Sequence, residues 1–185
     1  MRIVAGKYRG RLLRAVRGQD VRPTSDRLRE TLFNILAPNV VGTRFLDLCA
    51  GSGAVGIEAL SRGAAHATFV EQSRSACSVI RENLSSLSIE AEATVLCRDA
   101  AQAIRSLGGR GAQFDIIFFD PPYSSGIYSQ TLNMIEKNQV AADGGLVVVE
   151  HRAKTPPGTD FGGLKMYREL KQGESALTFY AVGIE

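Results

Sequence analysis

The segment Asp120-Pro121-Pro122-Tyr123 is the part of this sequence with the most specific chemistry. An exocyclic amine of a nucleic-acid base is a poor nucleophile because its lone pair is delocalised into the ring. The Asp120 carboxylate and the Pro121 carbonyl can accept its two N–H hydrogens, and the two prolines stiffen the loop. Tyr123 offers a flat face on which an extruded base can stack. The segment predicts chemistry on a base amine; the alternative is a Pro-Pro turn that closes a strand.

A glycine-rich segment gives a second candidate site. Gly51, Gly53 and Gly56 form a Gly-x-Gly-x-x-Gly pattern between a predicted strand and a predicted helix. Glycine there permits a tight turn and a close approach of ligand to backbone. Glu71, 20 residues after Gly51, can accept the hydrogen bonds of a ribose diol. Asp99, after the third predicted strand, can accept from an adenine amino group or cap a helix. The pattern predicts an adenosine-containing cofactor, with a ligand-free tight turn as the alternative.

Asp47 helps to distinguish between two such cofactors. It lies four residues before Gly51, where a carboxylate attracts the ammonium group of a methionine moiety and repels a pyrophosphate. Together with the segment at Asp120, this favours S-adenosylmethionine (SAM) over NAD. An NAD-dependent dehydrogenase is disfavoured further because the chain has no second substrate domain.

The elements that must position these residues alternate from Arg44 onward. Periodicity predicts strands over 44–49, 67–71, 93–98, 114–119 and 145–150, and helices over 54–62, 73–87, 99–107 and 126–138. Continuous apolar strands that alternate with helices are typical of an open, doubly wound parallel α/β sheet. Ligands of such sheets bind beyond the carboxyl ends of the strands, where the candidate residues lie. Residues 164–170 and 176–184 predict two further strands, antiparallel at one edge, and a helix is expected from about residue 25 to Ala37.

Basic residues gather in the first part of the chain. Residues 1–44 hold ten Lys or Arg and three acids, for a net charge of +7, whereas the remainder has 12 basic and 16 acidic residues, for −4. Residues 2–16 predict a small β-hairpin. A basic hairpin on an acidic body favours a polyanionic partner, although a solvated basic segment is the plainer interpretation. We expect residues 1–22 to form an arm that contacts RNA and residues 23–185 to form the catalytic domain.

Composition excludes several other classes of protein. The 185 residues, 44% of them hydrophobic, suit one domain. Three cysteines without a Cys-x-x-Cys pair, and only two histidines, argue against a disulfide scaffold and against a metal site. The longest apolar run is too short to cross a bilayer, and no secretion signal is expected. The expectation is a cytoplasmic, metal-free protein with no membrane partner, and nothing in the sequence requires more than a monomer.

Two N-terminal segments, RIVAGKYRGR from Arg2 and RPTSDRLRETLFNIL from Arg22, add to these motifs. With them, the chain from Arg2 to about Glu150 resembles the RsmD family of bacterial 16S rRNA guanine-N2 methyltransferases. These are class I, SAM-dependent enzymes. The resemblance implies a Rossmann-like, seven-stranded, mostly parallel sheet with an antiparallel C-terminal edge and an N-terminal β-hairpin extension. It implies SAM as methyl donor, S-adenosylhomocysteine as product, and a guanine near position 966 of 16S rRNA as target, in an assembled or assembling 30S particle.

The resemblance also implies a role for individual residues. The residues that would hold the base are Asp120, Pro121 and Tyr123. The residues that would hold the cofactor are Thr24, Asp26, Asp47, Gly51, Gly53, Glu71 and Asp99. The residues that would contact RNA are Lys7, Arg9, Arg11, Arg22 and Arg27.

Two other functions stay open on the sequence alone. A DNA adenine-N6 or protein-amide methyltransferase would use the same motif at Asp120, although the chain lacks a separate target-recognition domain. A non-catalytic RNA-binding module, such as an assembly factor, would account for the basic arm. The acidic residues at four predicted strand ends argue against that second alternative.

Overall fold

The computed structural model describes residues 1–16, 25–121 and 127–183. These residues form two compact units, Met1–Asp99 and Ala100–Glu185. Three of the predicted site residues, Arg22, Thr24 and Tyr123, lie outside the described residues. The strands of the first unit are β1 Arg44–Leu48, β2 His66–Glu71 and β3 Ala93–Cys97. Its helices are α1 Asp26–Leu36, α2 Ala54–Ser61 and α3 Arg74–Leu87, with short 3-10 turns at Ala37–Asn39 and Glu90–Glu92.

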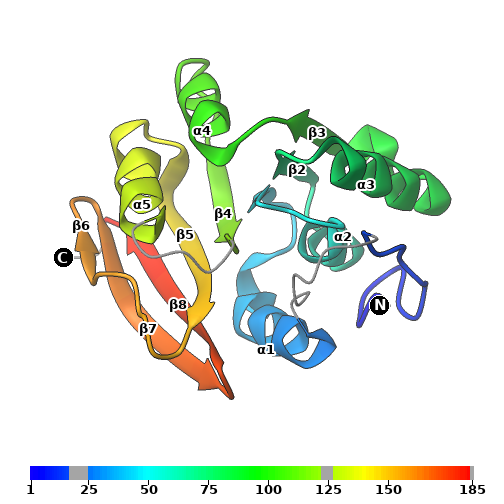
Figure 1. Cartoon of the computed structure of the whole chain (residues 1–185), viewed down its shortest axis with the longest axis horizontal. Helices are drawn as coiled ribbons and strands as arrows, with labels where there is room; N and C mark the ends of the chain where they lie inside the picture. The colour runs from blue at the N-terminus through cyan, green and yellow to red at the C-terminus, as the bar shows by residue number, and fades with distance from the viewer. Residues whose placement is uncertain (17–24, 122–126, 184–185) are drawn as a thin grey trace. The chain divides into compact units, whose positions relative to one another are not determined.

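The first unit is built on three parallel strands in the order β3-β2-β1 (Figure 1). Helix α2 connects β1 to β2, and α3 connects β2 to β3. Phe45, Leu46 and Phe69 are completely buried, as expected for strands that are covered on both faces. In this register Leu48 pairs with Val70, and Glu71 pairs with Cys97. The carboxyl ends of the strands, with the candidate residues that follow them, therefore lie at one edge of the sheet.

Helix α1 begins with a side-chain cap and ends near a proline. The Ser25 hydroxyl accepts a hydrogen bond from the Leu28 N–H at 3.1 Å, which satisfies one of the free donors at a helix N-terminus. Pro38 follows within the 3-10 turn and cannot continue the α-helical hydrogen bonding. The buried face of the helix includes Phe33, whose ring stacks on Phe45 of β1 at 6.1 Å between centroids.

Residues 1–16, called the arm from here on, form a hairpin with less strand pairing than the sequence predicts. Their only described ladder pairing is one antiparallel bridge between Arg2 and Leu12. Ile3 donates its N–H to the Arg11 carbonyl at 3.0 Å. Ile3 and Leu13 are buried. The arm makes many of its other polar contacts with α2 and α3.

The second unit combines parallel and antiparallel pairing. Its helices are α4 Ala100–Gly108 and α5 Ile127–Lys137, and its strands are β4 Phe114–Phe119, β5 Ala141–Arg152, β6 Asp160–Phe161, β7 Leu164–Gln172 and β8 Ser175–Val182. The strand order is β4-β5-β8-β7-β6, with β4 parallel to β5 and the remaining pairs antiparallel. Figure 1 shows this unit in green to red.

The predicted fold class is confirmed, with two differences in detail. The alternation of strands and helices and the antiparallel C-terminal pair both occur where the periodicity places them. The described residues hold eight strands where seven were expected, because the two-residue strand β6 pairs with the start of β7. Strand β5 also begins earlier than predicted, and a register shift between Phe114 and Ile116 of β4 accommodates the extra residues. No helix within the described ranges is both long and apolar enough to cross a membrane.

Candidate functional site

The glycine turn, residues 49–53, connects the end of β1 to α2. Gly53 has a φ of 80°, a left-handed conformation that residues other than glycine rarely adopt. A Cβ on Gly56, in the first turn of α2, would lie 2.3 Å from the Phe69 ring, so the helix can approach β2 only because that side chain is absent. A Cβ on Gly51 would meet nothing within 4 Å. The turn is therefore packed on its inner side and open at Gly51, which suits a ligand lying against the backbone.

Glu71 at the end of β2 holds the glycine turn directly. Its Oε2 accepts a hydrogen bond from the Gly51 N–H at 2.9 Å, and its Oε1 accepts one from the Ser73 N–H at 2.8 Å. Each carboxylate oxygen can accept a further hydrogen bond, and the residue is partly exposed. Glu71 can therefore fix the turn and still accept hydrogen bonds from a ribose diol.

Asp47, the fourth residue of β1, holds the other side of the turn. Its carboxylate is buried, with the residue 2% exposed, and accepts a hydrogen bond from the Gly56 N–H at 2.9 Å. Burial, opposed by the hydrogen bond from the Gly56 N–H and assisted by the Glu71 charge, raises the pKa of this carboxyl to about 7. A cation beside the carboxyl would favour its ionised form. Contact between Asp47 and the ammonium group of a methionine moiety stays a prediction.

The remaining predicted cofactor residues lie elsewhere in the first unit. Asp99 follows β3 by two residues, is partly exposed, and is the last residue of the unit. Asp26 is the first residue of α1, and its Oδ1 accepts a hydrogen bond from Arg29 Nη2 at 2.8 Å. The hydrogen bonds thus bring together Asp47, the glycine turn and Glu71, whereas Asp26 lies at the exposed end of a separate network centred on buried residues.

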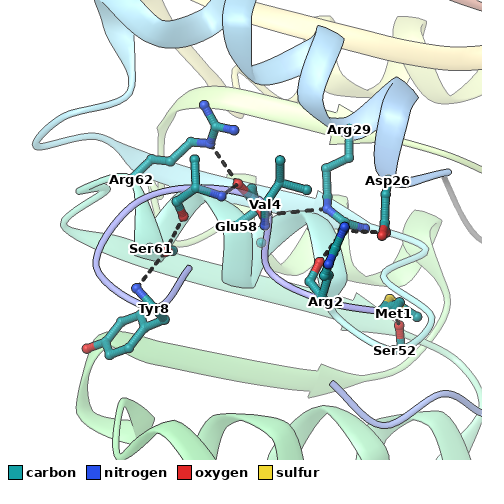
Figure 2. Close-up of polar contacts among 12 residues, drawn as sticks. Met1, Arg2, Val4, Tyr8, Asp26, Arg29, Ser52, Glu58, Ser61 and Arg62 are labelled. Carbon is teal, nitrogen blue, oxygen red and sulfur yellow. Dashed lines mark hydrogen bonds and ion pairs between the residues drawn. The ribbon is translucent and has the colours of Figure 1, made fainter. Parts of the chain in front are cut away.

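Glu58 of α2 is the centre of that network (Figure 2), and sequence reasoning did not find it. It is completely buried, and its carboxylate accepts hydrogen bonds from the N–H groups of Val4 and Ala5 at 2.8 and 2.9 Å. Arg62 Nε donates to it at 2.8 Å. Glu58 therefore fastens the start of the arm to the helix that follows the glycine turn. A sequence signal did exist, since Glu58 is the only charged residue in the apolar helix Ala54–Ser61.

Arg29 of α1 brings a buried positive charge to the same network. Its side chain is completely buried. Besides Asp26, Nη2 donates to the Arg2 carbonyl at 2.6 Å, and Nε lies 3.6 Å from Glu58 Oε2. Among the described residues, Nε and Nη1 have no hydrogen-bond partner. Two carboxylates therefore compensate this charge: Asp26, which is hydrogen-bonded to it and 46% exposed, and Glu58, which is buried with it.

Ser61 anchors the next part of the arm. Its hydroxyl donates to the Ala5 carbonyl at 2.6 Å and accepts from the Tyr8 N–H at 3.0 Å, and its carbonyl accepts from the Lys7 N–H at 2.7 Å. A Cβ on Gly6 would lie 1.9 Å from that carbonyl oxygen. Only glycine at position 6 allows the arm to lie this close to α2.

Four of the residues predicted to contact RNA lie within the described ranges, and all four are exposed. The Lys7 ammonium lies 5.1 Å from the centre of the Tyr8 ring. Arg9 lies in the turn of the hairpin, and Arg27 lies in the first turn of α1. Arg11 donates to the Ser86 carbonyl at 2.8 Å, so its guanidinium also helps to hold the arm to α3. These positions leave positive charge on the outer surface of the arm and at the start of α1.

The predicted base-binding residues belong to the second unit. Asp120 and Pro121 directly follow β4, a strand buried along most of its length. Asp120 is partly exposed, and Pro121 is buried. The strand thus places Asp120 and Pro121 at its carboxyl end, as the sequence predicts, and the rest of the motif lies outside the described residues. No cluster of three or more His, Cys, Asp and Glu suited to a metal ion occurs among the residues that the structure describes.

Parallel strands, a glycine turn held by acidic residues and an Asp-Pro-Pro-Tyr segment after β4 define a class I methyltransferase fold. Residues 1–181 match the model of the family described as "Conserved hypothetical protein 95", and the chain belongs to this family.

Relatives of known name agree with this assignment, and the resemblance to the RsmD family is confirmed. The chain is 38% identical over 180 residues to ribosomal RNA small subunit methyltransferase D of Escherichia coli K12, covering 97% of this chain and 89% of that protein. It is 37% identical over 180 residues to the putative rRNA methyltransferase YlbH of Bacillus subtilis, covering 97% and 98%. The solved structure of the putative methyltransferase yhhF from Escherichia coli has a TM-score of 0.88 at 38% identity, covering 98% of this chain and 97% of that one.

Proposed function

We propose that this chain transfers a methyl group from SAM to the exocyclic N2 of a guanine in the RNA of the small ribosomal subunit. The observation that carries the proposal is the hydrogen bond from the Gly51 N–H to Glu71, which holds the carboxylate that we propose to bind the ribose beside an open glycine turn. The names of the Escherichia coli and Bacillus subtilis relatives support methylation of rRNA. The choice of guanine N2 follows from the resemblance to the RsmD family.

The first unit contains the residues proposed to hold the cofactor. Glu71 would accept hydrogen bonds from the ribose, Gly51 and Gly53 would let the cofactor lie against the turn, and Asp99 would accept from the adenine amino group. Asp47, ionised, would attract the methionine ammonium group. Thr24 and Asp26, the first residue of α1, are also proposed to contact SAM. Bound SAM would supply a methyl group on a sulfonium ion and leave as the neutral thioether S-adenosylhomocysteine.

The segment after β4 is proposed to act on the base. The Asp120 carboxylate and the Pro121 carbonyl would accept the two N–H hydrogens of the amine and orient its lone pair, and Tyr123 would stack on the base. A carbon–nitrogen bond would form as the carbon–sulfur bond of the sulfonium breaks, and the methylated amine would then release one proton to solvent. Acceptors positioned before the substrate arrives would speed methyl transfer by orienting the amine. Guanine N2 lies at the minor-groove edge of a base pair, so the target must be unpaired or flipped out.

Exposed positive charge supports RNA contact by the arm. We propose that Lys7, Arg9 and Arg11 bind phosphates, together with Arg22 and Arg27. Replacing Lys7, Arg9 and Arg11 by alanine is expected to weaken RNA binding and to reduce its salt dependence, because fewer counterions are released. Binding of S-adenosylhomocysteine serves as the control for folding. An unchanged RNA affinity at low salt would remove these three residues from the RNA-binding surface.

The decisive experiment measures transfer of labelled methyl from SAM to RNA, followed by mass spectrometry of the nucleosides. We expect N2-methylguanosine, whereas N6-methyladenosine would overturn the proposed acceptor. Asp120→Ala is expected to abolish turnover and to leave calorimetric binding of S-adenosylhomocysteine largely intact. Turnover near that of the wild type would contradict the role of Asp120. Parallel assays on naked 16S rRNA and on 30S particles test the proposed particle substrate, and analytical ultracentrifugation tests the expected monomer.

A further inference from the structure

The arm reaches the glycine turn itself through one buried side chain, Asn83 of α3. Asn83 Oδ1 accepts a hydrogen bond from the Arg14 N–H at 2.8 Å, and Nδ2 donates to the Arg14 carbonyl at 3.1 Å. The same Nδ2 donates to the Ser52 carbonyl at 3.0 Å. Asn83 is 69 residues from Arg14 and 31 residues from Ser52 along the chain, so its amide joins three distant segments. The arm, α3 and the glycine turn are held together at this point.

The position of Asn83 would ordinarily be apolar. The residue is 1% exposed and shares the inner face of α3 with Ile80, Leu84 and Leu87. Burial of an amide is unfavourable unless its donors and acceptor are used. Here both N–H donors and the carbonyl oxygen have partners. A leucine would fill the same helix face, so packing of α3 alone does not explain an asparagine at this position.

Asn83 fixes one end of a peptide group whose other end is also fixed. The Ser52 carbonyl and the Gly53 N–H belong to the same planar unit. Asn83 binds the carbonyl, and the Gly53 N–H donates to the Ala50 carbonyl at 2.8 Å. The arm makes a second contact here, between Met1 Sδ and the Ser52 hydroxyl at 3.6 Å (Figure 2). The orientation of the Ser52–Gly53 peptide, and with it the backbone offered to a ligand, therefore depends on Asn83.

We propose that Asn83 is a positioning residue for the cofactor, which couples docking of the arm to the affinity of the glycine turn for SAM. The arm then has two roles, because it presents basic residues to RNA and also helps to form the cofactor site. This inference rests on the proposed function, since it assumes that the glycine turn binds SAM. Asn83 and the docked arm would act indirectly, by holding the backbone of the glycine turn, whereas the residues proposed above would contact SAM itself.

Asn83→Asp tests the coupling with little change in volume. It keeps an oxygen that can accept from the Arg14 N–H, but it removes both donors and directs a carboxylate oxygen at the Ser52 carbonyl. We expect the Kd of S-adenosylhomocysteine, measured by calorimetry well below the unfolding temperature, to rise about threefold to tenfold, as loss of one hydrogen bond that holds the turn implies. In the methyltransfer assay the KM for SAM should rise by a similar factor, with a smaller change in kcat.

Leu87→Ala is the control for a loss of stability alone. It truncates a buried side chain on the same face of α3, and the lost side chain makes no hydrogen bond. Leu87→Ala should leave the Kd within twofold of the wild type. An equal rise in Kd for Leu87→Ala and Asn83→Asp would overturn the inference, because the effect would then follow from weaker packing of α3.

A second pair of variants tests the arm without touching Asn83. Gly6→Ala places a methyl group against the Ser61 carbonyl, whereas Gly10→Ala, at the similar φ of 82°, meets nothing within 4 Å. Gly6→Ala should raise the Kd for S-adenosylhomocysteine and Gly10→Ala should not, and the effects of Gly6→Ala and Asn83→Asp should be less than additive.

The outcomes separate the inference from the proposed function. If the wild type binds S-adenosylhomocysteine but Asn83→Asp binds it equally well, the positioning role is overturned and the proposed function stands. Full additivity of Gly6→Ala and Asn83→Asp would overturn the coupling between arm and turn. A wild-type protein that does not bind S-adenosylhomocysteine would overturn the proposed function itself.

Discussion

Replacing Glu58 by glutamine should destabilise the first unit far more than a change of one atom suggests. The Glu58 carboxylate is completely buried and lies 3.6 Å from the buried Arg29 guanidinium. It also accepts hydrogen bonds from Val4, Ala5 and Arg62. Glutamine keeps one acceptor oxygen, but its amide group directs N–H hydrogens at groups that are themselves donors. The substitution leaves the Arg29 charge buried with less compensation.

The size of the expected loss of stability follows from the burial of both charges. Removing one partner of a buried ion pair costs about 3–5 kcal/mol, because the other charge stays out of water. Domains of this size lose roughly 2–4 °C in Tm per kcal/mol. The expected fall in Tm is therefore about 6–20 °C, out of a total stability of about 5–15 kcal/mol for a typical domain.

Thermal and urea unfolding followed by circular dichroism measure this effect. Glu82→Gln is the matched control, because Glu82 forms an ion pair with Arg14 in which the side chains are 50% and 75% exposed. Exposed pairs contribute less than about 1 kcal/mol, so this control should keep nearly the wild-type Tm. A Tm for Glu58→Gln within about 2 °C of the wild type would refute the view that this network holds the arm to α2.

Two further predictions concern single positions in the first unit. Gly6→Ala should lower the free energy of unfolding by several kcal/mol, because its Cβ would lie 1.9 Å from the Ser61 carbonyl oxygen. Gly10→Ala should lower it by only about 1–2 kcal/mol, from backbone strain. Equal losses in urea titrations of the two variants would contradict the close packing at Gly6. The folded-state pKa of Asp47, about 7, lies above the ordinary value of 3.8. Between these two values the folded protein binds more protons than the unfolded chain. The contribution of Asp47 to the free energy of unfolding is therefore lost as pH rises from about 4 to about 7. The stability of Asp47→Asn relative to wild type should therefore increase with pH in that window, by up to about 1.4 kcal/mol per pH unit, and a pH-independent difference in urea unfolding would show that the carboxyl is not perturbed.

Several features of the fold follow from short stretches of sequence. The strands β1, β2 and β4 are short and rich in apolar residues. The helices between them have apolar residues at helical spacing, so local periodicity is enough to predict these elements. The glycine turn is also local, because the glycines, the preceding strand and the following helix are neighbours in the chain. Asp47 and Glu71 could be identified as site candidates for the same reason, since both lie at or near the carboxyl end of a predicted strand.

The arm shows where local reasoning stops. The sequence predicts a hairpin from alternating residues, but the described ladder pairing is the single bridge between Arg2 and Leu12. Glu58 and Ser61 accept the arm's N–H groups instead, from positions 53 or 54 residues away. Neither the burial of Arg29 nor its pairing with Glu58 follows from the local pattern of α1, where an arginine is most simply predicted to face solvent.

The amino-acid sequence by itself determined the class of fold, the position of the glycine turn and the acidic residues around it, because these depend on periodicity and on residues close together in the chain. The tertiary structure decided which polar groups are buried and what they hold. Asn83 illustrates the difference, since its importance lies in contacts with Arg14 and Ser52, and such contacts exist only after distant segments have packed. A buried polar side chain is explained by its partners, and its partners are set by the fold.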